Sequence, residues 1–329
     1  MITEFERIAE NALVEIAKRN KYPILDLEAW SQLKPTGALI ENMLPAVGLG
    51  FLYGPTQSYK SFLTIALGGC ISTKQPFAGC EVKLQGNTLF CLSEGFEQFG
   101  FRARAWEIYH DETDFLGRFW NYPINLSSSL NVEAVIEQIR DAAIPNLRMI
   151  VIDTWIKSAG HISGNSDTDN IIAITNAQRI AEELRCFVLM VDHPGKDVDR
   201  GLRGSSAKEQ GVDVILRQKA IGERKVSISQ EKAKDHETVV NHIFSLKQIQ
   251  LTPKPNQESN PRWKKLGNSG VSLCLDVTET KRKSWETRAR DYLDQGCDEE
   301  TLRARLRGDG AKPADISKVV KKLRQEGNF

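Results

Sequence analysis

Residues 54 to 62 combine a glycine, a lysine and a hydroxyl group at a spacing that suits phosphate binding. They are, in order, Gly54, Pro55, Thr56, Gln57, Ser58, Tyr59, Lys60, Ser61 and Phe62. The phosphate-binding loop (P-loop) pattern, Gly-x4-Gly-Lys-Ser/Thr, is met at Gly54, Lys60 and Ser61, whereas Tyr59 occupies the position of the second glycine. Because a relaxed form of this pattern occurs by chance, the elements around it decide whether it is significant.

Those elements favour a nucleotide site. An apolar strand is predicted over Leu49–Tyr53 and an apolar helix over Ser61–Gly68, so backbone N–H groups and a helix N-terminus would surround one anion. We therefore expect residues 54–62 to bind ATP, with Lys60 on the β- and γ-phosphates and the Ser61 hydroxyl on Mg²⁺. The non-glycine residue Tyr59 predicts a loop that needs no positive φ there.

Three further polar residues follow predicted buried strands. Asp153 ends the apolar run at 149–152, the Walker B form, and is expected to hold Mg²⁺. Glu94 follows the run at 88–92 and is expected to polarise the attacking water, and His193 follows the run at 187–191 and is expected to sense the γ-phosphate. The alternatives are a cap for Asp153, a salt bridge or cap for Glu94 and a structural role for His193.

The hydrophobic pattern predicts an α/β fold. Short apolar strands alternate with helices over 61–68, 96–109, 132–143 and 170–184, which is typical of a largely parallel sheet. After residue 211, the runs at 212–216, 226–229 and 242–246 predict short strands that extend this sheet in antiparallel fashion. The apolar spacing in residues 1–20 predicts an amphipathic helix.

The expected organisation is an N-terminal helical extension (1–27), an α/β core (28–250), a linker with a strand extension (251–283) and a C-terminal helical module (284–329). In that module, helices are predicted over 285–293, 299–307 and 313–326, a pattern similar to a winged helix. Residues 281–329 contain 13 Lys or Arg against 9 Asp or Glu. This excess suits a nucleic-acid-binding face and a solvated helical surface equally well.

Composition limits the other classes of function. The net charge is +1, with 40% hydrophobic and 26% charged residues, so any nucleic-acid surface must be local. The six cysteines form no CxxC pair, which favours reduced, buried thiols over a zinc site. No apolar run approaches the roughly 18–20 residues of a membrane span, and a cytoplasmic protein is expected.

The chain resembles the RepA-like branch of the RecA/DnaB-type ATPases, which are hexameric replicative helicases of plasmids and phages. The residues that carry this resemblance are Lys60 and Ser61, Glu94, Asp153 and His193. Local matches support the resemblance: the lead-in segments 30–35 and 39–45, the region after Asp153, and the run from Arg203 to Ala207. The resemblance implies a RecA-like core over about 28–250, ATP and Mg²⁺ as ligands, and a homohexameric ring with ATP held between subunits.

The resemblance also implies roles for cations beyond the P-loop. In a ring, a cation from one subunit reaches the neighbour's ATP, and Lys232 and Lys234 are similar to that finger, with Arg203 as the rival. Single-stranded DNA would be contacted by loop residues, here Lys196, Arg200 and Lys208. An ordinary solvated charge run is the alternative for all of them.

Three functions remain open at this stage. The leading one is an ATP-dependent ring translocase or helicase on single-stranded DNA, acting in replication of a mobile element with a replication or loader protein. The second is an ATP-dependent regulatory or DNA-binding switch with slow hydrolysis. Tyr59 and the lysine finger favour it, because both depart from the pattern of a strong hydrolase. The third is a recombinase-like protein that forms open filaments.

Overall fold

The computed structural model describes residues 26–32, 37–160, 167–194, 202, 206–234, 242–255, 257–266, 270–281, 289–290, 292–293, 297–308 and 313–326. The chain divides into two compact units, Met1–Thr36 and Gly37–Phe329. In the first unit only helix α2 (Leu27–Ser31) is described, so the helix expected at 1–20 lies outside the described residues. No helix within the described ranges is long and apolar enough to cross a membrane.

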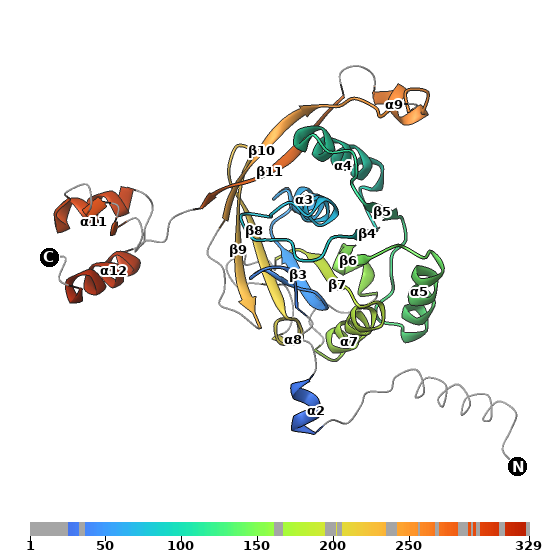
Figure 1. The fold of residues 1–329 in the computed structure, drawn as a ribbon, viewed down its shortest axis with the longest axis horizontal. Helices are drawn as coiled ribbons and strands as arrows, with labels where there is room; N and C mark the ends of the chain where they lie inside the picture. The colour runs from blue at the N-terminus through green and yellow to red at the C-terminus, as the bar shows by residue number, and fades with distance from the viewer. Residues whose placement is uncertain are drawn as a thin grey trace, which may run out of the picture. The chain divides into compact units, whose positions relative to one another are not determined.

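A large twisted sheet organises the second unit (Figure 1). Over the described residues it has nine strands. From edge to edge these are β11 (Val271–Lys281), β10 (His242–Gln250), β9 (Lys225–Ala233), β8 (Val214–Gly222), β3 (Gly48–Tyr53), β7 (Phe187–Asp192), β6 (Leu147–Asp153), β4 (Asn87–Leu92) and β5 (Gly117–Trp120). Strands β8 to β5 in this order are parallel, whereas β9, β10 and β11 add in antiparallel fashion. The predicted α/β fold with a mainly parallel sheet is confirmed.

Helices cover both faces of the parallel part (Figure 1). On one face lie α3 (Lys60–Thr73) and α4 (Phe96–His110), over which β10 and β11 curl. On the other lie α5 (Ser129–Asp141) and α7 (Asp167–Leu184), with the short helix α6 (Trp155–Ser158) after β6. Side chains alternate along each strand, so Phe51 packs into the second layer and Leu52 into the first.

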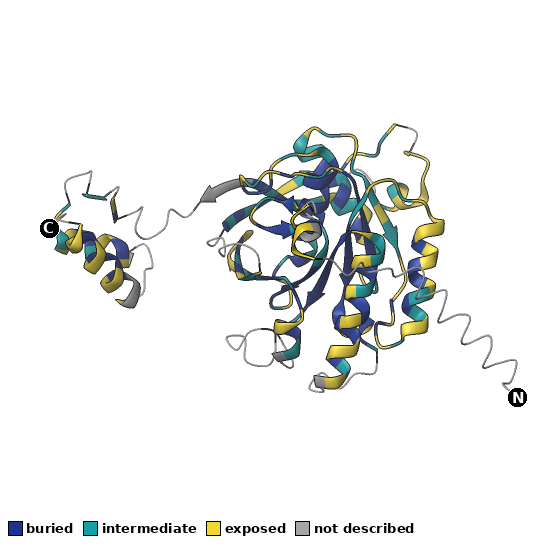
Figure 2. Cartoon of the chain, turned by 60° about the horizontal axis from the view of Figure 1, so that its bottom comes forward, coloured by how far each residue is buried: buried dark blue, intermediate teal, exposed yellow. Residues whose placement is uncertain are grey.

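The apolar strands supply the core of both layers. Figure 2 shows the strands buried between helices whose outer surfaces are exposed. Trp106, Phe90 and Phe187 are among the largest fully buried side chains. Four cysteines (Cys70, Cys91, Cys186 and Cys274) are buried as free thiols, as expected, and burial raises the pKa of Cys70 to about 12.

Several elements differ from the sequence-based expectation. The small antiparallel pair β1 (Ala38–Ile40) and β2 (Leu44–Pro45) and the strand β5 are too short to give a periodic signal. The segment 251–283, predicted as a linker with a strand extension, also contains helix α9 (Pro261–Leu266), none of whose residues is buried. Its sequence, Pro-Arg-Trp-Lys-Lys-Leu, lacks an apolar face, so its helical state depends on contacts made with α4.

The C-terminal residues form helices α11 (Glu299–Gly308) and α12 (Pro313–Gln325), close to the predicted limits. They share their own apolar cluster, which includes Leu302, Leu306 and Val320. The Glu299 carboxylate receives hydrogen bonds from Arg303 in the same helix and Arg324 in the other. Helix α8 (Ser206–Gln210) precedes β8 in the core unit.

Candidate nucleotide site

The loop between β3 and α3 is shaped by the close approach of the neighbouring strand β8. A β-carbon on Gly54 would lie 2.1 Å from the Gln218 carbonyl oxygen, so only glycine fits there. The buried Gln218 side-chain amide donates to the Ser58 carbonyl and holds the loop against β8. Within the described residues the buried Ser58 hydroxyl has no hydrogen-bond partner, which fits a loop prepared for phosphate oxygens.

Tyr59 corrects the expectation about the backbone of this loop. Its φ is 68° and its ψ 26°, a left-handed conformation, and Gln57 also has a positive φ of 63°. The prediction that Tyr59 would avoid a positive φ is therefore wrong. A left-handed residue costs about 1–2 kcal/mol, and contact of the Tyr59 ring with Phe62, at 6.0 Å between centroids, offsets part of this.

Lys60 is folded back into its own loop. Its Nζ donates to the carbonyl oxygens of Gly54 at 2.7 Å and Pro55 at 3.0 Å, and lies 3.4 Å from Nδ1 of His193. Burial lowers the pKa of Lys60 to about 8, although nearby carboxylates, Asp153 first, act in the opposite direction. The pKa of His193 is lowered by burial and then by the charge of Lys60, so a neutral imidazole faces the lysine. The P-loop and the end of β7 are thus in contact.

Asp153 and Ser61 lie side by side, as predicted for a metal site. The Ser61 hydroxyl donates to the Asp153 carboxylate at 3.5 Å, and Asp153 is only 6% exposed. The adjacent Thr154 hydroxyl is buried without a partner in the described part of the chain. A carboxylate with a neighbouring hydroxyl offers oxygen donors, which suit Mg²⁺. Burial, followed by the charge of Glu94, raises the pKa of Asp153 to about 6.

Glu94 stands at the same edge of the sheet, at the end of β4. Its carboxylate contributes to the electrostatics of Asp153, Lys60 and His193. In this structure it forms an ion pair with Lys157 of α6, with 3.0 Å between Oε2 and Nζ and both side chains about half exposed. An exposed pair of this kind contributes at most about 1 kcal/mol, so Glu94 can leave it readily.

Two residues of the site were missed in the sequence. The Ser93 hydroxyl donates to the Asp153 carbonyl and accepts from the Thr154 N–H, which joins the ends of β4 and β6. The Arg102 guanidinium, from α4, lies 4.9 Å from the Phe62 ring centroid, and burial lowers its pKa against the charge of Asp153. An arginine inside an amphipathic helix gives no sequence signal; only the folding of α4 over α3 reveals its place.

The structure does not support the predicted contact of Lys208 with DNA. Its side chain is 3% exposed and its Nζ lies 2.8 Å from the equally buried Asp192 carboxylate. It also lies 5.0 Å from the Trp155 ring centroid. A buried ion pair of this kind holds α8 to the end of β7 and cannot follow a nucleic-acid backbone. The other two predicted contacts, Lys196 and Arg200, lie outside the described residues.

The two described candidate finger residues make contacts with residues 209, 210 and 213. Lys232 donates to the carbonyl oxygens of Glu209 and Gln210, and Lys234 pairs with Asp213 at 3.5 Å with 68% of its side chain exposed. The rival candidate, Arg203, lies outside the described residues.

Comparison with known proteins adds a family. The family described as AAA domain (AAA_25) matches residues 17–199, more than half of the chain, and this range contains Lys60, Glu94, Asp153 and His193. A search of curated proteins finds no match. Among solved structures, the chain is similar to one described as an ATPase domain, with 12% identity and a TM-score of 0.49 over 72% of this chain and 94% of that one. The "Crystal structure of the RadB recombinase" has 12% identity and a TM-score of 0.44, over 61% and 87%.

Proposed function

The chain belongs to the AAA domain family of P-loop ATPases, and from this premise we propose that it is a RecA-like, Mg²⁺-dependent ATPase that assembles into a ring and translocates along single-stranded DNA as a helicase. The observation that carries the proposal is the meeting of Lys60, Ser61, Asp153, Glu94 and His193 at the carboxyl edge of the parallel strands. From the sequence resemblance we further propose that the protein acts in the replication of a mobile element and that it does so in the cytoplasm.

The chemistry follows from what each side chain offers. Lys60 would leave its two carbonyl partners and place its ammonium group against the β- and γ-phosphates, whose negative charge it neutralises. Ser61 and Asp153 would hold Mg²⁺, which supplies further charge neutralisation when bound. Glu94, once free of Lys157, orients the attacking water and accepts its proton. The neutral His193 senses the phosphate through its contact with Lys60.

The proposed ring would let a cation of one subunit reach the ATP of the next. Lys232 and Lys234 lie at the end of β9, and their contacts are with residues 209, 210 and 213 rather than with the P-loop. A cation from a neighbouring subunit would complete the charge stabilisation that phosphoryl transfer requires. Lysine offers a point charge instead of a bidentate fork, so a slower turnover is expected than with arginine.

A second function, an ATP-dependent switch that binds DNA or a regulatory partner, is favoured by one observation. Tyr59 holds the P-loop in a left-handed conformation with a bulky side chain where glycine is usual, which suits binding more than rapid cycling. Duplex binding that requires ATP but proceeds with slow turnover would support this function over the helicase.

The test combines mass measurement with hydrolysis assays. We expect a ring-sized assembly with a non-hydrolysable ATP analogue, and phosphate release that single-stranded DNA accelerates. Lys60→Ala should reduce turnover at least about 100-fold, whereas Lys225→Ala, an exposed lysine on β9, should not. Unchanged turnover in Lys60→Ala would refute the assignment of the nucleotide site. A rate of ATP hydrolysis that does not change with single-stranded DNA, together with no unwinding of a forked duplex, would refute the helicase function.

A further inference from the structure

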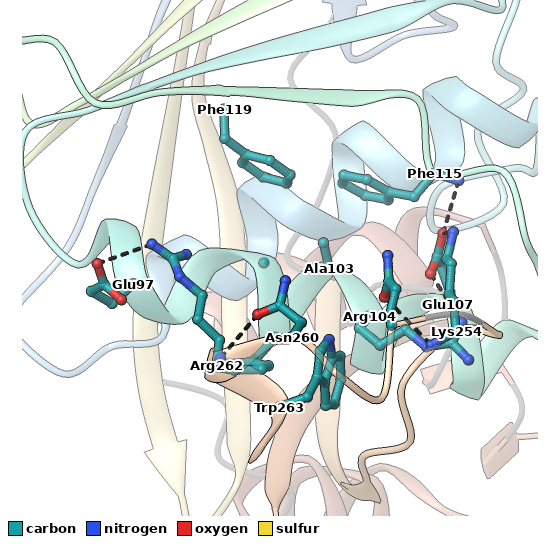
Figure 3. A pocket seen from close by; sticks show the side chains of 13 residues that line it. Glu97, Ala103, Arg104, Glu107, Phe115, Phe119, Lys254, Asn260, Arg262 and Trp263 are labelled. Atoms are coloured by element: carbon teal, nitrogen blue, oxygen red, sulfur yellow. Dashed lines mark hydrogen bonds and ion pairs between the residues drawn. The ribbon is translucent and has the colours of Figure 1, made fainter. Parts of the chain in front are cut away.

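A groove of about 270 Å³ lies between helix α4 and the connection that joins β10 to β11, which includes α9 (Figure 3). Its residues differ from those of the P-loop site. The connection is fastened to α4 by the ion pairs Arg262–Glu97 and Lys254–Glu107 and by edge-on contact between the Trp263 and Phe101 rings, at 5.1 Å between centroids. The Lys254–Glu107 pair, in which Glu107 is buried, and the ring contact contribute most to holding these walls together, because Arg262 and Glu97 are exposed.

Aromatic rings line the groove on two sides. Phe115 and Phe119 approach from β5 and the turn before it, with their planes within 4° of parallel, and Trp263 approaches from α9. Figure 3 shows Ala103 of α4 between these aromatic walls. Flat apolar walls of this kind favour a planar ring as the occupant, since base–aromatic stacking contributes about 1–3 kcal/mol per base.

The polar atoms of the groove are mainly donors. Its lining contains three cations (Arg104, Lys254 and Arg262) and two carboxylates. Both carboxylates are already engaged: Glu107 accepts from Lys254, Arg104 and the Phe115 N–H, and Glu97 from Arg262. The same ion pairs engage the three cations, but the lining has one more cation than carboxylates, so an occupant with acceptors and negative charge is favoured.

Two side-chain amides strengthen this donor character. Asn260 and Gln257 use their oxygens to accept from backbone N–H groups of Arg262 and Lys254. Within the described residues, their amide nitrogens have no hydrogen-bond partner, so both N–H groups are available to an acceptor in the groove.

The floor of the groove is kept low by a glycine in mid-helix. Gly100 lies inside α4, where glycine costs about 1 kcal/mol relative to alanine. A β-carbon there would meet no atom within 4 Å, so no close packing explains the glycine. What a side chain at this position would fill is the groove itself.

We propose that this groove is a second nucleotide-binding site, outside the P-loop, which takes a planar base against its aromatic walls and a phosphate by its cations. The nucleotide unit comes either from a single nucleic-acid strand or from a free mononucleotide. Because α4 follows Glu94 and carries Arg102, occupation of the groove bears on the ATPase site through this one helix.

The test uses the full chain with Lys60→Ala, so that the P-loop does not compete for the probes. Photo-crosslinking with a 5-iododeoxyuridine decanucleotide and with 8-azidoadenosine monophosphate is followed by peptide mapping. Gly100→Leu adds a side chain to the lining of the groove, and its β-carbon meets no atom within 4 Å. Gly222→Leu is the matched control, because a β-carbon there also meets no atom within 4 Å. Trp263→Ala removes one aromatic wall.

We expect crosslinks on the peptides of α4 or α9, at least about fivefold weaker with Gly100→Leu and unchanged with Gly222→Leu. Loss of about 1–3 kcal/mol of stacking in Trp263→Ala corresponds to about 5- to 150-fold weaker binding. Labelling by the decanucleotide alone identifies a strand, and labelling by the monophosphate identifies a free nucleotide. Absence of both crosslinks, or equal labelling of the two leucine variants, overturns the proposal, whatever the wild-type ATPase assay gives.

Discussion

Asp153→Asn should make the ligand-free protein more stable while it removes Mg²⁺-dependent hydrolysis. The carboxyl is 6% exposed, and its pKa is raised from 3.8 to about 6, first by burial and then by the charge of Glu94. An acid whose pKa is higher in the folded than in the unfolded state destabilises the fold once it ionises. Asparagine keeps the shape of the side chain and removes that charge.

The magnitude follows from the pKa. At about 1.4 kcal/mol for each tenfold change in proton affinity, a rise from 3.8 to about 6 costs the wild type about 3 kcal/mol in free energy of unfolding at about pH 8. The cost falls as the folded protein takes up its proton below about pH 6, to about 1 kcal/mol at about pH 4.5, and it vanishes below the unfolded pKa. The stabilisation by Asp153→Asn should follow the same course.

Thermal unfolding by calorimetry, in EDTA and without nucleotide, measures this directly. At about 2–4 °C per kcal/mol for a domain of this class, the Tm of Asp153→Asn should exceed that of the wild type by about 6–12 °C at about pH 8, with a gain about one third as large at about pH 4.5. A Tm equal to or below that of the wild type at about pH 8, or a gain independent of pH, would refute the reasoning from burial.

Three other substitutions probe the frame of the site. Gly54→Ala should destabilise the protein by at least about 2 kcal/mol because its methyl group meets the backbone of β8, whereas Gly222→Ala should change stability by less than about 0.5 kcal/mol; urea unfolding compares them. Lys208→Met leaves the buried Asp192 charge without its partner and should cost about 3–5 kcal/mol, and a midpoint within experimental error of wild type would contradict the buried ion pair. Lys157→Ala frees the carboxylate of Glu94, the proposed catalytic residue, and should raise basal phosphate release up to about fivefold; a tenfold fall would contradict this reasoning.

The strand-end residues of the site could be predicted because parallel strands bring their carboxyl ends to one edge. A run of apolar residues identifies the strand, and the first polar residue after it then has a known place. Asp153 and His193 were found in this way and lie next to Ser61 and Lys60. The inference needs only local sequence and the geometry of βαβ units.

Other features depend on partners that are distant in sequence. Lys208 belongs to a basic, glycine-rich stretch that predicts a mobile loop, but its buried partner Asp192 follows from the packing of α8 on β7. The φ of Tyr59 follows from closure of the loop against β8, which overrides the residue's own preference. Helix α9 has no apolar periodicity, and Trp263 contacts α4 only after the β10–β11 connection has folded back.

The hydrogen bond that the Gln218 side-chain amide donates to the Ser58 carbonyl couples strand β8 to the P-loop. β8 pairs with β9, on which Lys232 lies opposite Ile215. The proposed finger residue Lys232 and the P-loop are therefore connected through the backbone hydrogen bonds between β8 and β9. The β8–β9 register shifts between Ile215 and Leu216, so this ladder is interrupted between Lys232 and Gln218. A displacement of Lys232 is therefore expected to reach the P-loop only in part. In the proposed ring, loss of a γ-phosphate from the neighbouring subunit would change the environment of Lys232 and, through β9 and β8, that of this subunit's P-loop.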